Sequence, residues 1–169
     1  FIASNKKVKS NYKKLSEKYQ LSTDLSKKVG MKTHPTAEGI YRSRRVKIES
    51  AVRDSIDGGK VIPHTVLTVE CSNSENFFFK LYKLVEDNEF DDKFIIQTNS
   101  PDRIKKMFDF NTKFKLDQVN ALGFNGLIAL EGNRLFYMEP ELLANDDALM
   151  RLELVMHELC DIAEIMKYN

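Results

Sequence analysis

Apolar residues recur at helical spacing near both ends of this chain. Near the start, intervals of three and four residues place four side chains on one face of a helix over residues 5–20: Val8, Tyr12, Leu15 and Tyr19. Near the end, the same intervals continue without a break through Leu149, Leu152, Met156, Leu159, Ala163 and Met166. Val155 and Ile162 widen this second stripe to the breadth typical of a helix that faces a core. The sequence therefore predicts a helix at each end, of which the C-terminal one is long and amphipathic.

Between these helices the apolar period changes to two, the period of a β-strand with one buried face. Strands are predicted over residues 40–52, 61–71, 77–84, 94–98, 127–130 and 135–138. Turn sequences join several of them: Asp57-Gly58-Gly59, Glu86-Asp87-Asn88-Glu89 and Glu131-Gly132-Asn133. Two short helices are expected, one starting at Ser100-Pro101-Asp102 and one over residues 112–122. Short connections favour antiparallel pairing, so we expect an α+β fold: an antiparallel sheet of about six strands with helices packed on it.

Residues 22–38 follow neither period. They are largely polar and contain Gly30 and the pair His34-Pro35, whose proline disfavours helix at the residue before it. This segment is expected as an extended tether or as a loop lying on the domain. The predicted organisation is a basic N-terminal helix with its connecting segment over residues 1–38, followed by a single α+β domain over residues 39–169.

The formal net charge of +1 hides an asymmetry along the chain. Residues 1–60 carry 15 Lys and Arg against 6 Asp and Glu, whereas residues 61–169 carry 11 against 19. A basic leading segment indicates an anionic partner, either lipid headgroups or nucleic acid, unless its lysines only solvate an exposed helix. The lysines expected to face an anion or a membrane are Lys6, Lys7, Lys13 and Lys14.

The composition, with 42% hydrophobic and 30% charged residues, is that of a globular domain. No apolar run reaches the ~18 residues of a membrane-spanning helix. Phe1-Ile2-Ala3 before Lys6 and Lys7 matches the end of such a helix and its cytoplasmic positive flank, or else an arbitrary boundary. The only cysteines, Cys71 and Cys160, are distant in sequence and favour reduced, buried thiols in a reducing compartment.

Motifs for nucleophilic catalysis, phosphate-binding glycine loops and zinc proteases are absent from the sequence. The segment His157-Glu158-Leu159-Cys160-Asp161 begins like the zinc-protease motif, but its fifth residue is Asp instead of His. Glu153, His157 and Asp161 are spaced by four, so they share one helix face and could bind a metal. The alternative is that they form the polar face that an amphipathic helix needs opposite its apolar stripe.

Two further clusters have both a functional and a structural interpretation. Arg42 and Arg44 are expected on one face of the first strand, where they either hold a phosphate or protect an edge strand with charge. The run Phe77-Phe78-Phe79 has the aromatic character of a nucleic-acid stacking surface, but alternation along a strand favours core packing.

Three short segments resemble elements of one family. They are the basic helix Lys13-Lys14-Leu15-Ser16-Glu17-Lys18-Tyr19-Gln20-Leu21, the strand Gly39-Ile40-Tyr41-Arg42-Ser43-Arg44-Arg45-Val46, and Phe90-Asp91-Asp92-Lys93-Phe94-Ile95-Ile96 followed by Ser100-Pro101. In this order the chain is similar to a globular domain of uncharacterised bacterial membrane-anchored proteins. The resemblance implies a membrane segment before Phe1 and assigns no activity and no functional residue.

These observations lead to one expected function and one alternative. We expect a non-catalytic domain of a membrane-associated protein that acts through protein or ligand binding, in the cytoplasm at the inner face of a membrane. Its expected partners are an anionic membrane surface or another protein; nucleic acid is not favoured, and no cofactor is expected. The alternative is a metal-dependent hydrolase that uses Glu153, His157 and Asp161.

Overall fold

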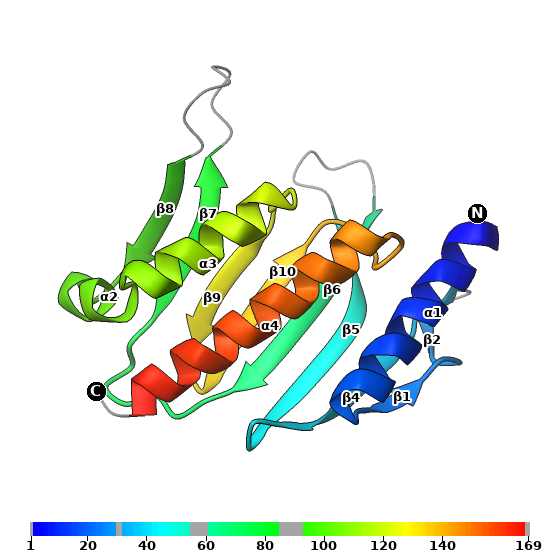
Figure 1. Cartoon of the computed structure of the whole chain (residues 1–169), viewed down its shortest axis with the longest axis horizontal. Helices are drawn as coiled ribbons and strands as arrows, with labels where there is room; N and C mark the ends of the chain where they lie inside the picture. The colour runs from blue at the N-terminus through cyan, green and yellow to red at the C-terminus, as the bar shows by residue number, and fades with distance from the viewer. Residues whose placement is uncertain (1, 30–31, 55–60, 85–92, 168–169) are drawn as a thin grey trace.

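The computed structural model describes residues 2–29, 32–54, 61–84 and 93–167 (Figure 1). In chain order its elements are α1 (Ile2–Tyr19), β1 (Ser22–Asp24), β2 (Lys28–Val29), β3 (Lys32–Thr33), β4 (Thr36–Tyr41), β5 (Arg44–Asp54), β6 (Val61–Glu70), β7 (Phe79–Leu84), β8 (Lys93–Thr98), α2 (Pro101–Met107), α3 (Phe110–Ala121), β9 (Leu127–Glu131), β10 (Arg134–Glu139) and α4 (Asp146–Lys167). The predicted turns at 57–59 and 86–89, and the segment 90–92 of the family resemblance, lie outside the described residues.

The fold is α+β, as the sequence predicts. The main sheet is antiparallel throughout, with the strand order β1-β4-β5-β6-β10-β9-β7-β8, and β2 and β3 form a separate pair. In the described part of the chain this sheet therefore has eight strands, which corrects the expected number of about six. The additional strands are β1 and β4. Strand β1 lies in the polar segment 22–38, and β4 combines the end of that segment with the start of the first predicted strand, which a turn separates from β5.

A two-residue turn at Arg42 and Ser43 divides that predicted strand into β4 and β5. Both turn residues adopt a positive φ, of 50° and 63°, which is the conformation of a type I′ hairpin turn. Such turns favour Asn-Gly or Asp-Gly. Glycine has no Cβ to clash in the left-handed region, and the short side chains of Asn and Asp can form a local hydrogen bond there, whereas other side chains disfavour it. The pair Arg-Ser therefore gives no turn signal in the sequence, and the expected common strand face of Arg42 and Arg44 is wrong.

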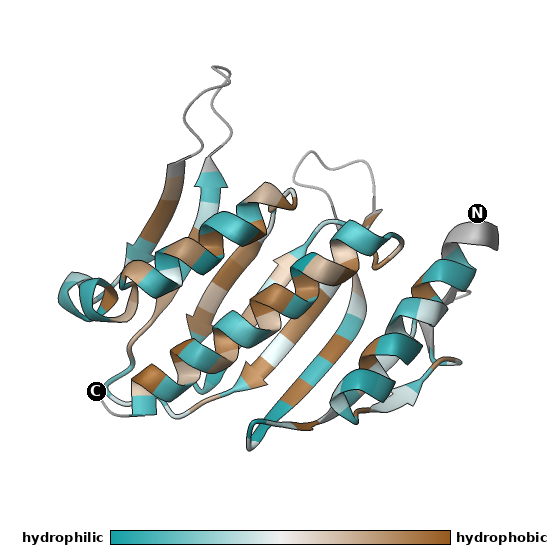
Figure 2. Ribbon diagram, viewed as in Figure 1, coloured by the Kyte–Doolittle hydropathy of each residue, from teal (hydrophilic) through white to brown (hydrophobic). Residues whose placement is uncertain are grey.

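The core lies between one face of the sheet and the helices, which lie side by side on that face (Figure 1). Cross-strand register lines up one apolar row over six strands, from Ala37 through Ile48, Leu67, Tyr137, Ile128 and Leu81. Each of these side chains is buried. Helix α4 packs on β6 and β10. It contacts them through its predicted apolar stripe, in which Leu152, Met156 and Leu159 are fully buried. Figure 2 shows apolar and polar faces alternating around this helix.

Helix α1 docks on the sheet next to β1 and β4. The four residues of its predicted stripe are buried, and so is Asn11, which donates a hydrogen bond to the carbonyl of Leu143 over 2.9 Å. The expected boundary after residue 38 falls inside β4, so the connecting segment forms part of the sheet. In the described part of the chain, no helix has the length and apolar character needed to cross a bilayer.

Candidate functional site

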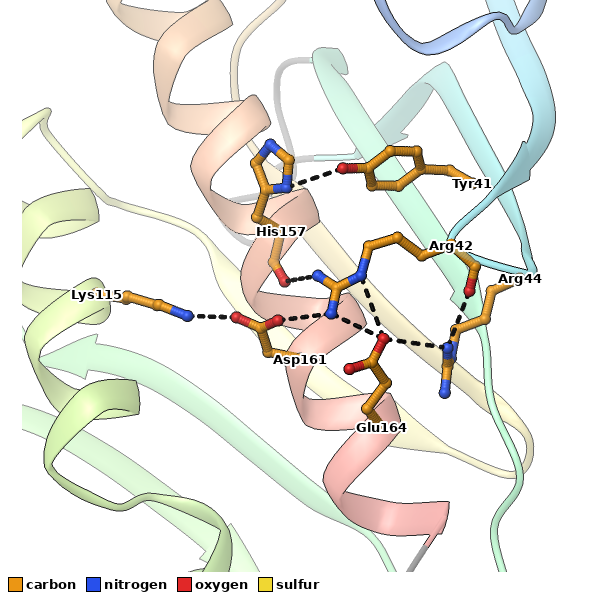
Figure 3. Close-up of polar contacts among 7 residues, drawn as sticks. All are labelled: Tyr41, Arg42, Arg44, Lys115, His157, Asp161 and Glu164. Atoms are coloured by element: carbon orange, nitrogen blue, oxygen red, sulfur yellow. Dashed lines mark hydrogen bonds and ion pairs between the residues drawn. The ribbon is translucent and has the colours of Figure 1, made fainter.

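The polar face of α4 lies between α1, the β4–β5 hairpin and α3. Glu153, His157, Asp161 and Glu164 follow one another at intervals of four, four and three residues, so they project along one side of the helix. Their partners come from three other elements. Figure 3 shows Tyr41 pointing at His157, and it shows Arg42 between Asp161 and Glu164, with Lys115 on the other side of Asp161. The sequence predicts the shared face on α4, but not the partners, which are far away in the chain.

His157 is held between two tyrosines from different elements. Its Nε2 lies 3.3 Å from the hydroxyl of Tyr19 on α1, and its Nδ1 lies 3.2 Å from the hydroxyl of Tyr41 on β4. The three rings also meet edge to face in every pair, with centroids 5.1 to 5.8 Å apart. The tyrosine hydroxyl of α1 in addition donates to Glu153 Oε1 over 3.1 Å.

These contacts fix the direction of the hydrogen bonds. Because a carboxylate only accepts, the Tyr19 hydroxyl donates to Glu153 and has its lone pairs left for the Nε2–H of His157. In the neutral imidazole Nδ1 is then the acceptor, and it accepts a hydrogen bond from the Tyr41 hydroxyl. Burial and the nearby charge of Arg42 lower the pKa of His157, which keeps the ring neutral near pH 7. Burial, with Glu153 close by, raises the pKa of Tyr19.

Arg42 extends from the hairpin turn across the next part of α4 (Figure 3). Its Nη2 lies 2.8 Å from Asp161 Oδ1 and 2.8 Å from Glu164 Oε1, and its Nη1 donates to the carbonyl of His157 over 3.5 Å. Burial opposes the charged form of Arg42, but the ion pairs with both carboxylates outweigh burial and raise its pKa. Arg42, one of the two turn residues with a positive φ, therefore anchors the hairpin to α4.

Asp161 links the same network to α3. It accepts from Lys115 on one side and from Arg42 on the other. Although burial alone raises the pKa of this carboxyl, hydrogen bonds from Lys115 and Arg42 reverse the effect and lower it. The side chains of α4 that looked like a solvated polar face thus contact the three neighbouring elements.

The three candidate metal ligands do not converge on one point. Glu153 bonds to Lys18 and Tyr19, His157 to two tyrosines, and Asp161 to Arg42 and Lys115. Among the residues that the structure describes, no three His, Cys, Asp or Glu side chains are grouped as ligands of one ion. Each of the three side chains is engaged with partners on a different element, so this geometry gives no support to the metal-dependent hydrolase.

Most of the basic residues of α1 lie on the face away from the sheet, and Lys7 is an exception. Lys6, Lys13 and Lys14 are exposed, whereas Lys7 is half-buried and pairs with Asp146 over 2.8 Å. Lys9 is also part of the basic leading segment, and it lies on the same exposed face as Lys6 and Lys13. Arg44 lies apart from these lysines, next to Arg42, and donates to its carbonyl over 3.1 Å.

A buried ionic cluster was not predicted from the sequence. Arg151, only 3% exposed, donates through Nε to Glu139 Oε2 over 2.7 Å, through Nη1 to the carbonyl of Leu122, and through Nη2 to Glu141. Glu139 also accepts from Tyr137, and burial raises its pKa despite these donors. An arginine inside the apolar stripe of α4 was a signal that a buried carboxylate would face it. The cluster joins α4, β10 and the end of α3.

Comparison of the chain with protein families, with curated proteins and with solved structures gives no match. The resemblance to the bacterial membrane-anchored domains accordingly stays a prediction.

Proposed function

We propose that this chain is a non-catalytic binding domain that lies against an anionic membrane surface with the exposed face of α1. The observation that carries the proposal is a set of three exposed lysines, Lys6, Lys9 and Lys13, one helical turn apart. Within the described residues none of the three forms an ion pair with a carboxylate, whereas Lys7 and Lys18 do. Their charge is thus available to a partner outside the chain.

The docking of α1 strengthens the electrostatic argument. A lysine close to an anionic leaflet contributes about 1 kcal/mol, so three of them contribute about 3 kcal/mol in total. Because α1 is held by its buried stripe and by the tyrosine contacts of His157, the lysines are already arranged before binding. In this proposal the polar cluster on α4 is a clamp that holds the membrane-facing helix, and it is not a reaction centre.

Sedimentation with vesicles tests the proposal. The chain should sediment with phosphatidylglycerol vesicles much more than with phosphatidylcholine vesicles. The binding should weaken as the salt concentration rises from about 50 to about 500 mM, because the Debye length then falls from roughly 14 Å to about 4 Å. Replacing Lys6, Lys9 and Lys13 together by Gln should lower the partition coefficient by about a hundredfold.

The matched control removes the same charge elsewhere. Lys105, Lys106 and Lys113 are exposed on α2 and α3, so the triple Gln variant at these positions should bind vesicles nearly like the wild type. Equal losses in both triple variants would show that net charge, and not the face of α1, governs binding. Binding that ignores lipid charge would contradict the proposal, and the protein partner expected as the alternative would then take its place.

A further inference from the structure

A second basic feature lies on the other side of the β4–β5 hairpin, away from α1. A pocket of about 320 Å³ opens where β5 begins, β6 ends and α4 ends. Arg44 and Lys167 contribute positive charge to its lining, and Ser43 and Ser72 contribute hydroxyl groups. Arg45 and Glu70 also line it, and because their charges are opposite they cancel. The pocket therefore has two net positive charges and several hydrogen-bond donors.

Within the described residues, the guanidinium of Arg44 makes one hydrogen bond and one long ion pair. Its side chain is 15% exposed, and its hydrogen bond goes to a neutral acceptor, the carbonyl of Arg42. The carboxylate of Glu164 stands 3.9 Å away, and the same oxygen already accepts from Arg42. Glu164 is thus a long and shared ion-pair partner, and the guanidinium of Arg44 keeps N–H donors for a further anion.

We propose that this pocket binds a phosphate group, held by Arg44 and Lys167 with the Ser43 and Ser72 hydroxyls as further donors. Phosphate fits because a monoester is close to a dianion at neutral pH and matches the two net positive charges. Its oxygens also accept the planar fork of an arginine together with hydroxyl donors. The phosphate comes from a soluble phosphate compound or from a lipid headgroup, since both carry the same group.

The half-buried thiol of Cys71 lines the pocket and offers a direct readout of its occupancy. Cys160 is fully buried, so alkylation of the native chain by iodoacetamide reports on Cys71, with Cys71→Ser as the blank. Burial raises the pKa of this thiol to about 11. Because the thiolate is the nucleophile and little of it is present at pH 8, alkylation at this pH should be slow. Inorganic phosphate should slow the alkylation, and sodium chloride at equal ionic strength should not.

Variants of the two cations decide whether the protection comes from this pocket. Arg44→Gln should weaken phosphate binding, measured by calorimetry and by protection of the thiol, about tenfold or more. Lys167→Gln should weaken it to a smaller extent, and because Lys167 is exposed at the end of α4, this variant remains informative if Arg44→Gln fails to fold. The control Lys105→Gln, on the exposed face of α2, should leave it unchanged.

Two vesicle arms separate the sources of the phosphate. If a headgroup supplies it, Arg44→Gln should reduce sedimentation with phosphatidic acid, a monoester, but not with phosphatidylglycerol, a diester. If a soluble compound supplies it, both vesicle types should bind this variant like the wild type while binding of free phosphate is lost. The proposal is overturned if phosphate acts no differently from chloride, or if both cation variants bind phosphate normally. Since the α1 triple variant should keep phosphate binding, this test fails or succeeds independently of the membrane proposal.

Discussion

Glu158 on α4 is a carboxyl group that the fold buries without a partner. The residue is 1% exposed, and neither of its oxygens accepts a hydrogen bond within the described structure. Burial raises its pKa to about 7; Lys115 on α3 counteracts this, while Asp161 and Asp109 add to it. The charge pattern of α4 alone cannot reveal such a residue, because Glu158 and its exposed neighbours are the same residue types. Only the packing of α3 on α4 distinguishes them.

Replacing Glu158 by Gln should stabilise the chain at pH 8 and change little at pH 4. In the unfolded chain the carboxyl titrates near 4.5, so between pH 4.5 and 7 the folded state binds more protons than the unfolded one. Stability therefore falls as pH rises through this window, by about 3 kcal/mol. Glutamine mimics the neutral acid, so the variant avoids this loss. Urea unfolding at both pH values measures it, with exposed Glu17→Gln as the control. An equal gain at pH 4 and pH 8 would refute the interpretation.

At the scale of elements, the long periodic segments were predictable and the short polar ones were not. The apolar stripes fix α1 and α4, the period of two fixes β6 and β10, and Glu131-Gly132-Asn133 is the turn between β9 and β10. In contrast, β1 and β4 bury little besides Ala37, so they leave no apolar pattern. The run of three phenylalanines packs as expected at Phe77 and Phe79, while Phe78 is 40% exposed.

Of the candidate site, only the residues contributed by α4 could be predicted from the sequence. Spacing by four groups Glu153, His157 and Asp161, but their functional meaning depends on Tyr19, Tyr41 and Arg42, which are more than 100 residues away in sequence. Pairing across that separation is a property of the sheet and of helix docking, and a single sequence does not contain it in any local pattern. Without the partners, two carboxylates and an imidazole suggest a metal site.

The turn between β4 and β5 and the turn between β9 and β10 provide a matched pair for testing backbone strain. Ser43 has a φ of 63° without a glycine, so Ser43→Gly should stabilise the chain by about 0.5–1 kcal/mol. Gly132 has a φ of 56°, and an added Cβ would meet nothing within 4 Å, so Gly132→Ala should cost about 1 kcal/mol through the backbone alone. Thermal unfolding of both variants measures the effects. Shifts of the same sign would contradict the assignment of strain to the turn between β4 and β5.

At the scale of the whole molecule, the described helices cover one face of the sheet, so a single layer of contacts supplies most of the core (Figure 1). The other face carries a row of half-buried side chains across five strands: Val66, Met138, Leu127, Tyr82 and Ile95. Helix α4 lies over the centre of the covered face, where it contacts β6, β10, α2 and α3. The stability of the molecule should therefore depend on α4 more than on any other helix.

Truncation of Leu152 tests this dependence. The side chain is fully buried, so Leu152→Ala should leave a cavity and cost about 2–5 kcal/mol, a large share of the ~5–15 kcal/mol that holds a domain together. Met150, two residues earlier on the same helix, is 51% exposed, and Met150→Ala should stay within about ±0.5 kcal/mol. Urea unfolding at two protein concentrations gives both values. If the stripe instead paired with a second chain as a coiled coil, the wild-type midpoint would rise with protein concentration, because unfolding would be linked to dissociation. Packing on the sheet within one chain requires a midpoint that is independent of concentration and that falls sharply only in Leu152→Ala.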